Sequence, residues 1–183
     1  MTSHAKQELA KAALEVARNG TWGDLTVSSL AEKAQVARRT FYRHFESLSD
    51  VLLFAMRQLG ESVGNAICGT RVVRGALPFP DNYLNAIFGY WRGNRNLLRN
   101  LAALNFGLQA VEMWVAGVGG AVHRIDLDNW NELWQIDYLA TFMGTGLSSV
   151  LLKWACEDDG RSASEVSALF GKTLASLAPG SKR

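Results

Sequence analysis

Apolar side chains recur every three or four residues along most of this chain, which is the spacing of amphipathic helices. In the N-terminal third, Leu9, Ala12 and Val16 share one face of a helix that stops at the Asn19-Gly20 pair. Thr26 stands where its hydroxyl can cap the next helix. The pattern predicts the first four helices over residues 4–18, 27–34, 38–44 and 48–66.

Beyond residue 80 the same spacing predicts five more helices, so we expect an all-α fold of about nine helices. Residues 69–80, rich in Gly and Pro, have the composition of a loop. Asn129 with Glu132, and Ser162 with Glu165, form capping-box starts for the last two helices. The five helices are expected over residues 83–92, 94–104, 108–122, 129–157 and 162–177.

The composition is that of a folded globular protein. Of the 183 residues 48% are hydrophobic, which is enough for a sizeable core. No secretory segment opens the chain, and no run approaches the ~20 apolar residues of a membrane helix. Cys68 and Cys156 are the only cysteines, too few for a disulfide framework or a zinc site. We therefore expect a cytoplasmic protein with no metal, no cofactor and no membrane contact.

Positive charge is concentrated in the N-terminal third. Residues 1–60 hold eight Lys or Arg against six Asp or Glu, whereas residues 61–183 hold eleven of each. Because a neutral second part is poorly suited to polyanions, it is expected to bind a partner chain or a small molecule. The densest stretch, residues 33–44, contains no carboxylate and has the cationic side chains of Lys33, Arg38, Arg39 and Arg43.

Residues 26–45, T-V-S-S-L-A-E-K-A-Q-V-A-R-R-T-F-Y-R-H-F, form two short helical patterns separated by a turn. Leu30 on the first helix can be covered by Phe41 and Phe45 from the second. The second has barely two turns, and so short a helix does not persist alone in water. Its cations and hydroxyls therefore indicate a helix-turn-helix in which a supported second helix reads the major groove of duplex DNA.

The stretch V-A-R-R-T-F-Y-R-H-F followed by E-S-L-S-D-V-L-L resembles the third helix and the start of the fourth helix in the TetR family of bacterial transcriptional regulators. The resemblance extends from about Lys6 to Leu53. It implies a helix-turn-helix DNA-binding domain over residues 1–46 and a helical domain for effector binding and dimerisation over residues 47–183. It also implies that the fourth helix transmits effector binding to the DNA-binding domain.

The resemblance assigns roles to single residues of the second helix. Arg38, Arg39 and Thr40 are expected at base edges, Tyr42 and His44 at phosphates, and Phe41 and Phe45 in the core. The chemistry agrees, because the Arg fork matches guanine O6 and N7 and a Thr methyl group suits thymine. The full set of expected DNA contacts is Thr26, Ser28, Arg38, Arg39, Thr40, Tyr42, Arg43, His44 and Ser47.

Three positions depart from the family pattern. Gln35 stands where Gly is usual in the turn, and Gln is less suited to a positive φ. Ala37 stands where Ser or Thr usually caps the reading helix. Leu48 replaces a Lys that usually reaches a phosphate, although Ser47 and Asp50 still form an S-x-x-D start for the fourth helix.

The helix expected over residues 129–157 has two apolar stripes, which predicts burial on both sides. One stripe, from Trp130 to Phe142, is expected to face its own domain, and the other a second subunit. With the last helix it resembles the family's dimer-forming pair, a four-helix bundle across a two-fold axis. The expected interface residues are Met143, Leu147, Val150, Leu151, Trp154, Val166, Leu169, Phe170, Thr173 and Leu174.

Five of the six Trp lie beyond residue 90, and together with neighbouring aromatics they could line an effector pocket or simply form the core. Asp137 or Glu112 beside these rings would favour a cationic or hydroxyl-bearing ligand, unless both carboxylates are solvated. The candidate pocket residues are Phe88, Trp91, Phe106, Glu112, Trp114, Trp130, Trp134, Asp137, Tyr138, Thr141 and Phe142.

These features favour a homodimeric repressor that a small aromatic or lipophilic effector releases from a palindromic operator. An activator or a ligand-independent regulator of the same fold stays open, as does a helical protein-interaction module without DNA binding. The G-V-G-G stretch ending the seventh helix lacks the strand and third glycine of a dinucleotide site, and predicts close packing or a kink. No nucleophile–base pair or phosphate loop is present, so we do not expect an enzyme.

Overall fold

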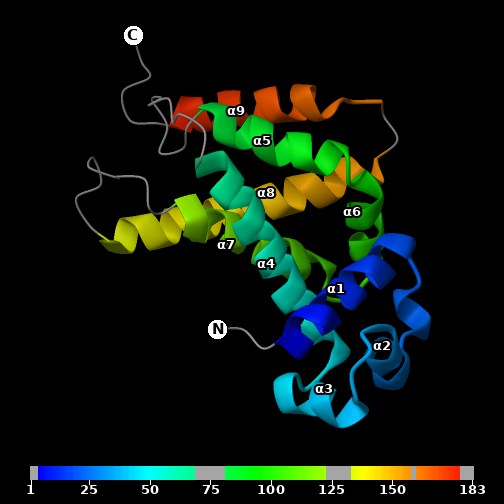
Figure 1. Cartoon of the computed structure of the whole chain (residues 1–183). Coiled ribbons are helices and arrows are strands. Elements are labelled where there is room, and N and C mark those ends of the chain that lie inside the picture. The colour runs from blue at the N-terminus through cyan, green and yellow to red at the C-terminus, as the bar shows by residue number, and fades with distance from the viewer. Residues whose placement is uncertain (1–3, 69–80, 123–132, 158–159, 178–183) are drawn as a thin grey trace.

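The computed structural model describes residues 4–68, 81–122, 133–157 and 160–177, and in these ranges it contains helices and no strand (Figure 1). The expected all-α fold is therefore confirmed. The expected loop at residues 69–80 and the Asn129–Glu132 cap lie outside the described residues. The helices are α1 (His4–Asn19), the short 3-10 helix η1 (Trp22–Asp24), α2 (Val27–Lys33), α3 (Arg38–His44), α4 (Leu48–Cys68), α5 (Asp81–Arg92), α6 (Arg95–Ala102), α7 (Gly107–Val122), α8 (Leu133–Cys156) and α9 (Ala163–Leu177).

Local capping explains why several helices begin where the sequence predicted. Thr26 Oγ1 accepts a hydrogen bond from the Ser29 backbone N–H at 3.1 Å, while Ser29 Oγ accepts one from the Thr26 N–H at 3.0 Å. Ser162 and Glu165 make the same reciprocal pair at the start of α9, with distances of 2.8 and 3.2 Å. These boundaries follow from short-range chemistry, and α3 has the predicted bounds.

The three N-terminal helices and the first turn of α4 enclose a small core. Leu9 of α1, Leu30 of α2 and Phe41 of α3 have no exposed surface, and Val51 of α4 joins them. At its edge the Lys6 ammonium lies 4.2 Å from the centroid of the Phe54 ring, a cation–π contact that links α1 to α4. The short α3 is thus held by tertiary packing, as the helix-turn-helix prediction required.

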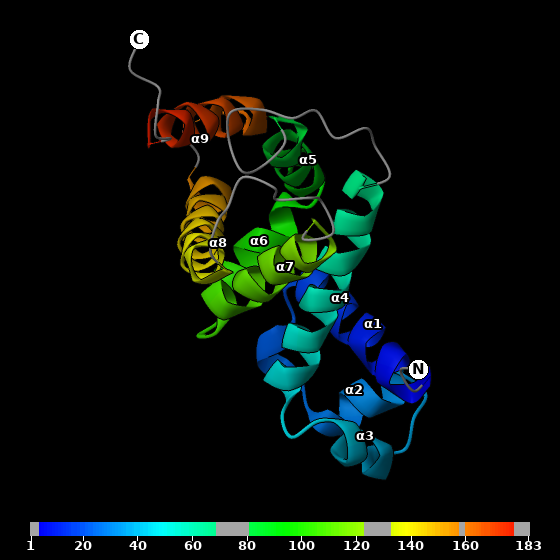
Figure 2. The same ribbon diagram turned by 90° about the vertical axis from the view of Figure 1, so that its left-hand side faces the viewer.

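A larger core lies between α4 and the five following helices. Figure 2 shows α4 leaving the α1–α3 unit and running beside α7, with α5 and α9 near the opposite end of the molecule. The largest fully buried side chains of this core include Met56 of α4, Trp91 of α5 and Trp114 of α7. Helix α4 therefore contributes side chains to both cores and connects them.

Two glycines allow α4 and α7 to cross with their backbones in contact. A Cβ atom on Gly60 of α4 would overlap the Trp114 carbonyl oxygen of α7. On the other helix, a Cβ atom on Gly117 would overlap the carbonyl oxygen of Arg57. The small residues near the end of α7 therefore serve close packing at Gly117, one of the two roles that the sequence suggested.

The α1–α3 unit is also joined to the larger core through α6. The Asn100 side-chain amide donates to the carbonyls of Ala17 and Arg18, both at 2.9 Å, and so satisfies the C-terminal end of α1. Nearby, the rings of Trp22 and Phe106 meet edge to face with centroids 6.0 Å apart. Movement of α6 would therefore act directly on the end of α1.

Candidate functional site

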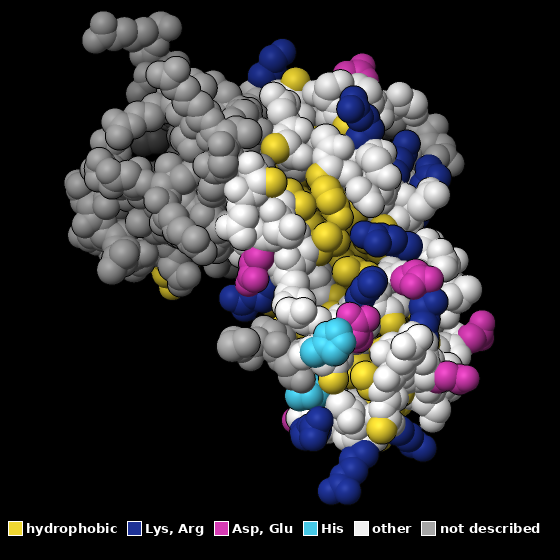
Figure 3. Space-filling view, in the orientation of Figure 1, with side chains coloured by type: hydrophobic (Ala, Val, Ile, Leu, Met, Phe, Trp, Pro, Cys, Tyr) yellow, Lys and Arg dark blue, Asp and Glu magenta, His cyan; other side chains and the backbone are white. Residues whose placement is uncertain are grey.

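The outward side of α3 carries the charges of the proposed reading surface. Arg38, Arg39, Tyr42 and Arg43 are exposed, whereas Phe41 between them is completely buried. Figure 3 shows Lys and Arg side chains projecting from the end of the molecule where Figure 1 places α2 and α3. The arrangement presents cations and a phenol outward from a helix that is anchored by an aromatic side chain.

Tyr42 is positioned by its neighbours on α3. Its ring meets Phe41 edge to face with centroids 5.3 Å apart, and the Arg38 guanidinium carbon lies 5.7 Å from its centroid. An Arg38 Nη atom also donates to the Tyr42 hydroxyl at 3.4 Å. These contacts keep a hydroxyl and a guanidinium together at the solvent surface, where both can reach one nucleic-acid backbone.

Lys33 differs from the other cations of this stretch. Its ammonium binds the Glu15 carboxylate of α1 at 2.8 Å, which joins α2 to α1. The free positive charge of the reading surface therefore comes from Arg38, Arg39 and Arg43. Sequence spacing could not reveal this ion pair, because its partners lie on different helices.

The turn before α3 contains both of the unusual residues that the sequence indicated. Gln35 has φ +55°, the left-handed conformation that glycine adopts without steric cost. Ala37 occupies the N-cap with φ −68° and ψ 142° and supplies no side-chain hydrogen bond. Leu48, in place of a phosphate-reaching Lys, packs partly buried against the smaller core. The turn keeps the helix-turn-helix geometry without its usual stabilising residues.

The remaining expected DNA contacts occupy mixed environments. Thr26 and Ser28 are exposed at the start of α2, but the Thr26 hydroxyl already caps that helix. Ser47 caps α4 and is half-buried, with its N–H bound to the Asp50 carboxylate at 2.9 Å. His44 is half-buried, and its Nε2 atom has no hydrogen-bond partner among the described residues, so the expected phosphate contact of His44 stays a prediction.

The two stripes of α8 face the opposite way from the sequence prediction. Leu147, Leu151 and Trp154, expected at a subunit interface, are buried in the protomer's own core. Tyr138 and Phe142, expected to face that core, are 73% and 63% exposed. Both stripes are equally apolar, so periodicity alone could not tell which one the fold would bury.

The expected interface residues on α9 are also partly exposed and partly packed in the protomer's own core. Leu169 is 63% exposed and Thr173 is exposed, whereas Val166 and Phe170 pack partly buried against the larger core, as does Val150 of α8. The side chains of Met143 and Leu174 lie outside the described part of the chain. Among the side chains of α8 and α9 that the structure describes, the large apolar ones left exposed are Tyr138, Phe142 and Leu169.

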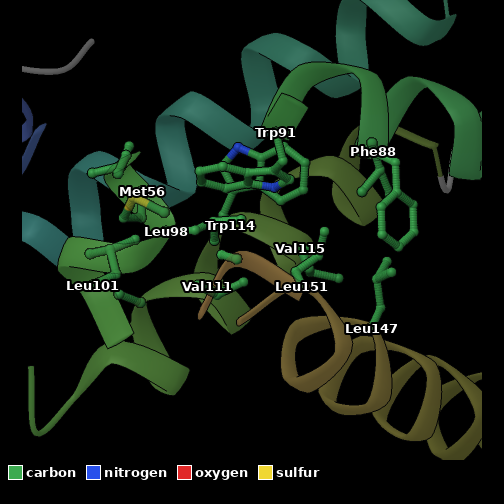
Figure 4. Close-up of a cluster of buried hydrophobic side chains, with 14 of the residues drawn as sticks. Met56, Phe88, Trp91, Leu98, Leu101, Val111, Trp114, Val115, Leu147 and Leu151 are labelled. Carbon is green, nitrogen blue, oxygen red and sulfur yellow. The ribbon is translucent and has the colours of Figure 1, made fainter. Parts of the chain in front are cut away.

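The candidate pocket residues do not form one group. Phe88, Trp91 and Trp114 pack together in the larger core (Figure 4), while Phe106 meets Trp22 at the domain junction. Thr141 is exposed beside Tyr138 and Phe142. The expectation of one continuous aromatic lining is thus corrected for the described residues. Trp130 and the side chains of Trp134 and Asp137 lie outside them.

Glu112 is not beside the buried Trp rings as a free carboxylate. It accepts a hydrogen bond from the Thr145 hydroxyl at 3.1 Å, so it connects α7 to α8. The expected role of Glu112 in selecting a cationic ligand stays a prediction. The described residues also contain no group of three His, Cys, Asp or Glu side chains able to hold a metal ion.

Tyr90 was not singled out in the sequence, yet it joins the two parts of the molecule. Its ring stacks on Trp114 with centroids 5.4 Å apart. Burial raises the pKa of the Tyr90 phenol, and the charge of Arg18, with a hydrogen bond from that side chain, offsets part of the rise in pKa. Arg18 lies in the last turn of α1, so the aromatic cluster of the larger core contacts the α1–α3 unit directly.

Residues 9–53 match the family model described as "Bacterial regulatory proteins, tetR family". No match was found among curated proteins. Among solved structures, the Thermus thermophilus FadR repressor in complex with lauroyl-CoA is similar at a TM-score of 0.62 and 17% identity, with 92% of each chain covered.

Two further structures show the same fold. FadR of Bacillus halodurans, described as a fatty acid degradation regulator, has a TM-score of 0.59 and 14% identity over 100% of this chain and 99% of that chain. The dihydroxyacetone kinase operon activator DhaS has a TM-score of 0.55 and 14% identity, covering 95% of this chain and 96% of that chain. In the part of the chain that the structure describes, no helix is long and apolar enough to cross a membrane.

Proposed function

We propose that this chain is a homodimeric transcriptional repressor acting in the cytoplasm. Two findings support the proposal: its N-terminal residues match the tetR family of bacterial regulatory proteins, and its fold is TetR-like. The observation that carries the proposal is α3, where exposed Arg38, Arg39 and Arg43 surround a buried Phe41 anchor. A short cationic helix presented in this way suits the major groove of DNA.

The roles on α3 divide between base edges and backbone. Arg38 and Arg39, at the start of the helix, offer bidentate donors for guanine, and Thr40 offers a methyl group for thymine. Tyr42 and Arg43 suit phosphate oxygens, because their exposed donors do not depend on base sequence. The proposed complex therefore combines base selection at the start of α3 with backbone contacts near its end.

Dimerisation supplies the second reading helix that an operator requires. One two-turn helix buries too little surface for tight and specific binding, whereas two helices about 34–36 Å apart, or a multiple of that, read a palindrome. Figure 2 shows α8 and α9 on the same outer side of the molecule. Tyr138 and Phe142 of α8 and Leu169 of α9 are exposed apolar side chains that a second copy would cover in the proposed dimer.

Release from the operator is proposed to follow from an effector bound in the larger core. The FadR structure from Thermus thermophilus was solved with lauroyl-CoA, so a similar fold holds a ligand with an acyl chain in that protein. Helix α4 contributes to both cores here, and its crossing with α7 offers a mechanical route from ligand to α3. An activator of the same fold is the second candidate, favoured by the likeness to DhaS.

The decisive experiment is selection of bound DNA from a random pool, followed by mobility-shift titration at two salt concentrations. Arg39→Ala should relax base preference at one position of each half-site, whereas Tyr42→Phe should weaken all sequences alike. Affinity should fall steeply with salt, because phosphate contacts release counterions. A chain that selects no sequence and shows no salt-dependent DNA affinity would instead be a protein-interaction module. Equal losses on every sequence for both variants would contradict the division of roles.

Transcription from a template carrying the selected operator separates repressor from activator. A repressor lowers transcript yield when the chain is added, while an activator raises it. The measurement uses the full chain and needs no knowledge of the effector.

A further inference from the structure

Trp91 and Trp114 place two unpaired hydrogen-bond donors in the middle of the larger core. Both side chains are 0% exposed, and their rings lie 4.9 Å apart between centroids. The Nε1 atom of each ring is buried and has no hydrogen-bond partner among the described residues. An indole N–H can only donate, so neither ring has another way to satisfy that group.

This arrangement differs from ordinary core packing of tryptophan. Elsewhere in the same core, Trp154 is also buried, but its Nε1 donates to the Arg161 carbonyl at 3.0 Å. Buried donors in folded proteins are nearly always paired, because an unmade hydrogen bond costs folding free energy. Two unpaired donors on adjacent rings therefore indicate a place where an outside acceptor binds.

The surroundings limit what that acceptor can belong to. Figure 4 shows the two indoles surrounded by apolar side chains from several helices, among them Met56, Leu98, Val111 and Val115. The stacked ring of Tyr90 covers Trp114. A charged ligand atom buried among these groups would lose its hydration without a counter-ion, whereas a neutral oxygen needs only an N–H donor.

We propose that the Nε1–H groups of Trp91 and Trp114 form the polar end of the effector site, and that the effector is a neutral, largely apolar molecule with a carbonyl or ester oxygen. This inference rests on the proposed function in one respect, because the bound molecule is an effector only if the chain is a ligand-controlled regulator. It differs from the cationic ligand that was one of the two possibilities suggested by the sequence, since two N–H donors repel a cation.

Trp114 also connects the proposed ligand site to α4. Because both indoles are fully enclosed, an entering molecule must separate α5, which carries Trp91, from α7, which carries Trp114. The carbonyl of Trp114 lies against Gly60 of α4, so α7 cannot shift at this point without moving α4. The donor that holds the ligand is thus part of the residue that contacts the helix leading to α3.

The test uses two probes of matched shape, benzophenone and diphenylmethane, which differ in one carbonyl oxygen. Calorimetric titration of the full-length chain, without DNA, should show benzophenone binding about tenfold or more tightly, as expected of one or two added hydrogen bonds. In nitrogen–proton correlation spectra, the indole N–H signals of Trp91 and Trp114 should move downfield with benzophenone and not with diphenylmethane. Trp91→Phe and Trp114→Phe assign those two signals.

The Phe variants keep an aromatic ring and remove the donor, so the double variant should bind both probes equally. Trp154→Phe, which removes a donor that is already paired within the protein, is the control and should keep the preference for benzophenone. Equal affinity of the native chain for both probes, or no binding of benzophenone, overturns the proposal. So does a native chain in which no indole N–H signal moves downfield with benzophenone, and this readout does not depend on the variants folding. A chain that prefers benzophenone but binds no DNA would contradict the proposed function and leave this site standing.

Discussion

Gly60 of α4 lies directly against the carbonyl oxygen of Trp114 in α7, with no room for a Cβ atom between them. Gly117 repeats the arrangement from the other helix, against the backbone of Arg57. The helix that leads to the reading surface is therefore held to the larger core by backbone contact as well as by side-chain packing, and backbone contacts of this kind do not adjust by rotamer changes.

Gly60→Ala is expected to lower the free energy of unfolding by about 1–3 kcal/mol, because the methyl group forces α4 and α7 apart. Gly89→Ala on α5 is the matched control, since nothing lies within 4 Å of its Cβ position. In the control, the free energy of unfolding should rise by about 0.5–1 kcal/mol, because Ala has a higher helix propensity than Gly. Urea denaturation of both variants measures the difference. Equal stability of the two would show that the crossing tolerates a side chain.

Gln35→Gly is expected to raise the free energy of unfolding by about 0.5–1 kcal/mol, because it removes the steric cost of φ +55° for a residue with a Cβ atom. Gln35→Ala keeps the Cβ atom and should bring no such gain. Chemical denaturation of the native chain and of both variants measures their free energies of unfolding. A gain of equal size with alanine would mean that the Gln side chain, rather than the backbone conformation, is the source of the cost.

Asn100→Ala is expected to cost about 1–2 kcal/mol of folding free energy, because it leaves the Ala17 and Arg18 carbonyls without their donor. Asn96→Ala lies on the same helix at an exposed position, so it carries the same change in helix propensity without that contact. The difference between their thermal midpoints isolates the link between α6 and α1. If the two variants melt together, α6 does not hold the end of α1.

Tyr90 should make stability fall at high pH. Burial raises the pKa of its phenol above 10.0 in the folded chain, so the folded state keeps a proton that the unfolded state releases. The contribution of Tyr90 to the free energy of unfolding is complete below pH 10.0. It is lost as pH rises through the higher pKa of the folded state. Tyr90→Phe should flatten this decline in urea titrations between about pH 9.5 and 11.5. Tyr42→Phe, which removes an exposed phenol, is the control, and a decline of native steepness in Tyr90→Phe would contradict the assignment.

Phe142→Glu should convert the proposed dimer to a monomer without unfolding the protomer, because the side chain is 63% exposed on α8. Leu108→Glu, on α7 and 42% exposed, adds the same charge away from the α8 and α9 surface. Sedimentation velocity gives the mass of each, and circular dichroism shows whether the helices persist. A dimer unaffected by Phe142→Glu would place the interface elsewhere.

The reading surface could be predicted from the sequence because its determinants are local. Thr26 caps α2, Ser47 and Asp50 cap α4, and the spacing of Phe41 and Phe45 sets the buried side of α3. Each of these relations spans at most a few residues, so helical geometry alone places the partners. The unusual turn was indicated by the resemblance to the family pattern, in which Gly is usual where this chain has Gln35, and the structure gives Gln35 a positive φ.

The larger core is where prediction from the sequence failed. The two stripes of α8 are both apolar, and helical periodicity assigns residues to faces without saying what each face meets. Only packing against α6 and α7 decides that Leu151 is enclosed and Phe142 is exposed. For the same reason, the sequence could not separate Trp154, whose donor is paired, from Trp91 and Trp114, whose donors are not.

The sequence by itself determined the helices, their caps and the cationic reading helix, because these depend on propensity, spacing and hydrogen bonds within a turn or two. The tertiary structure decided the contacts between distant residues: Gly60 against Trp114, Asn100 at the end of α1, and the unpaired indoles in one cluster. These depend on how helices far apart in the chain approach one another, and that approach is set by the shape of the whole core rather than by any local pattern.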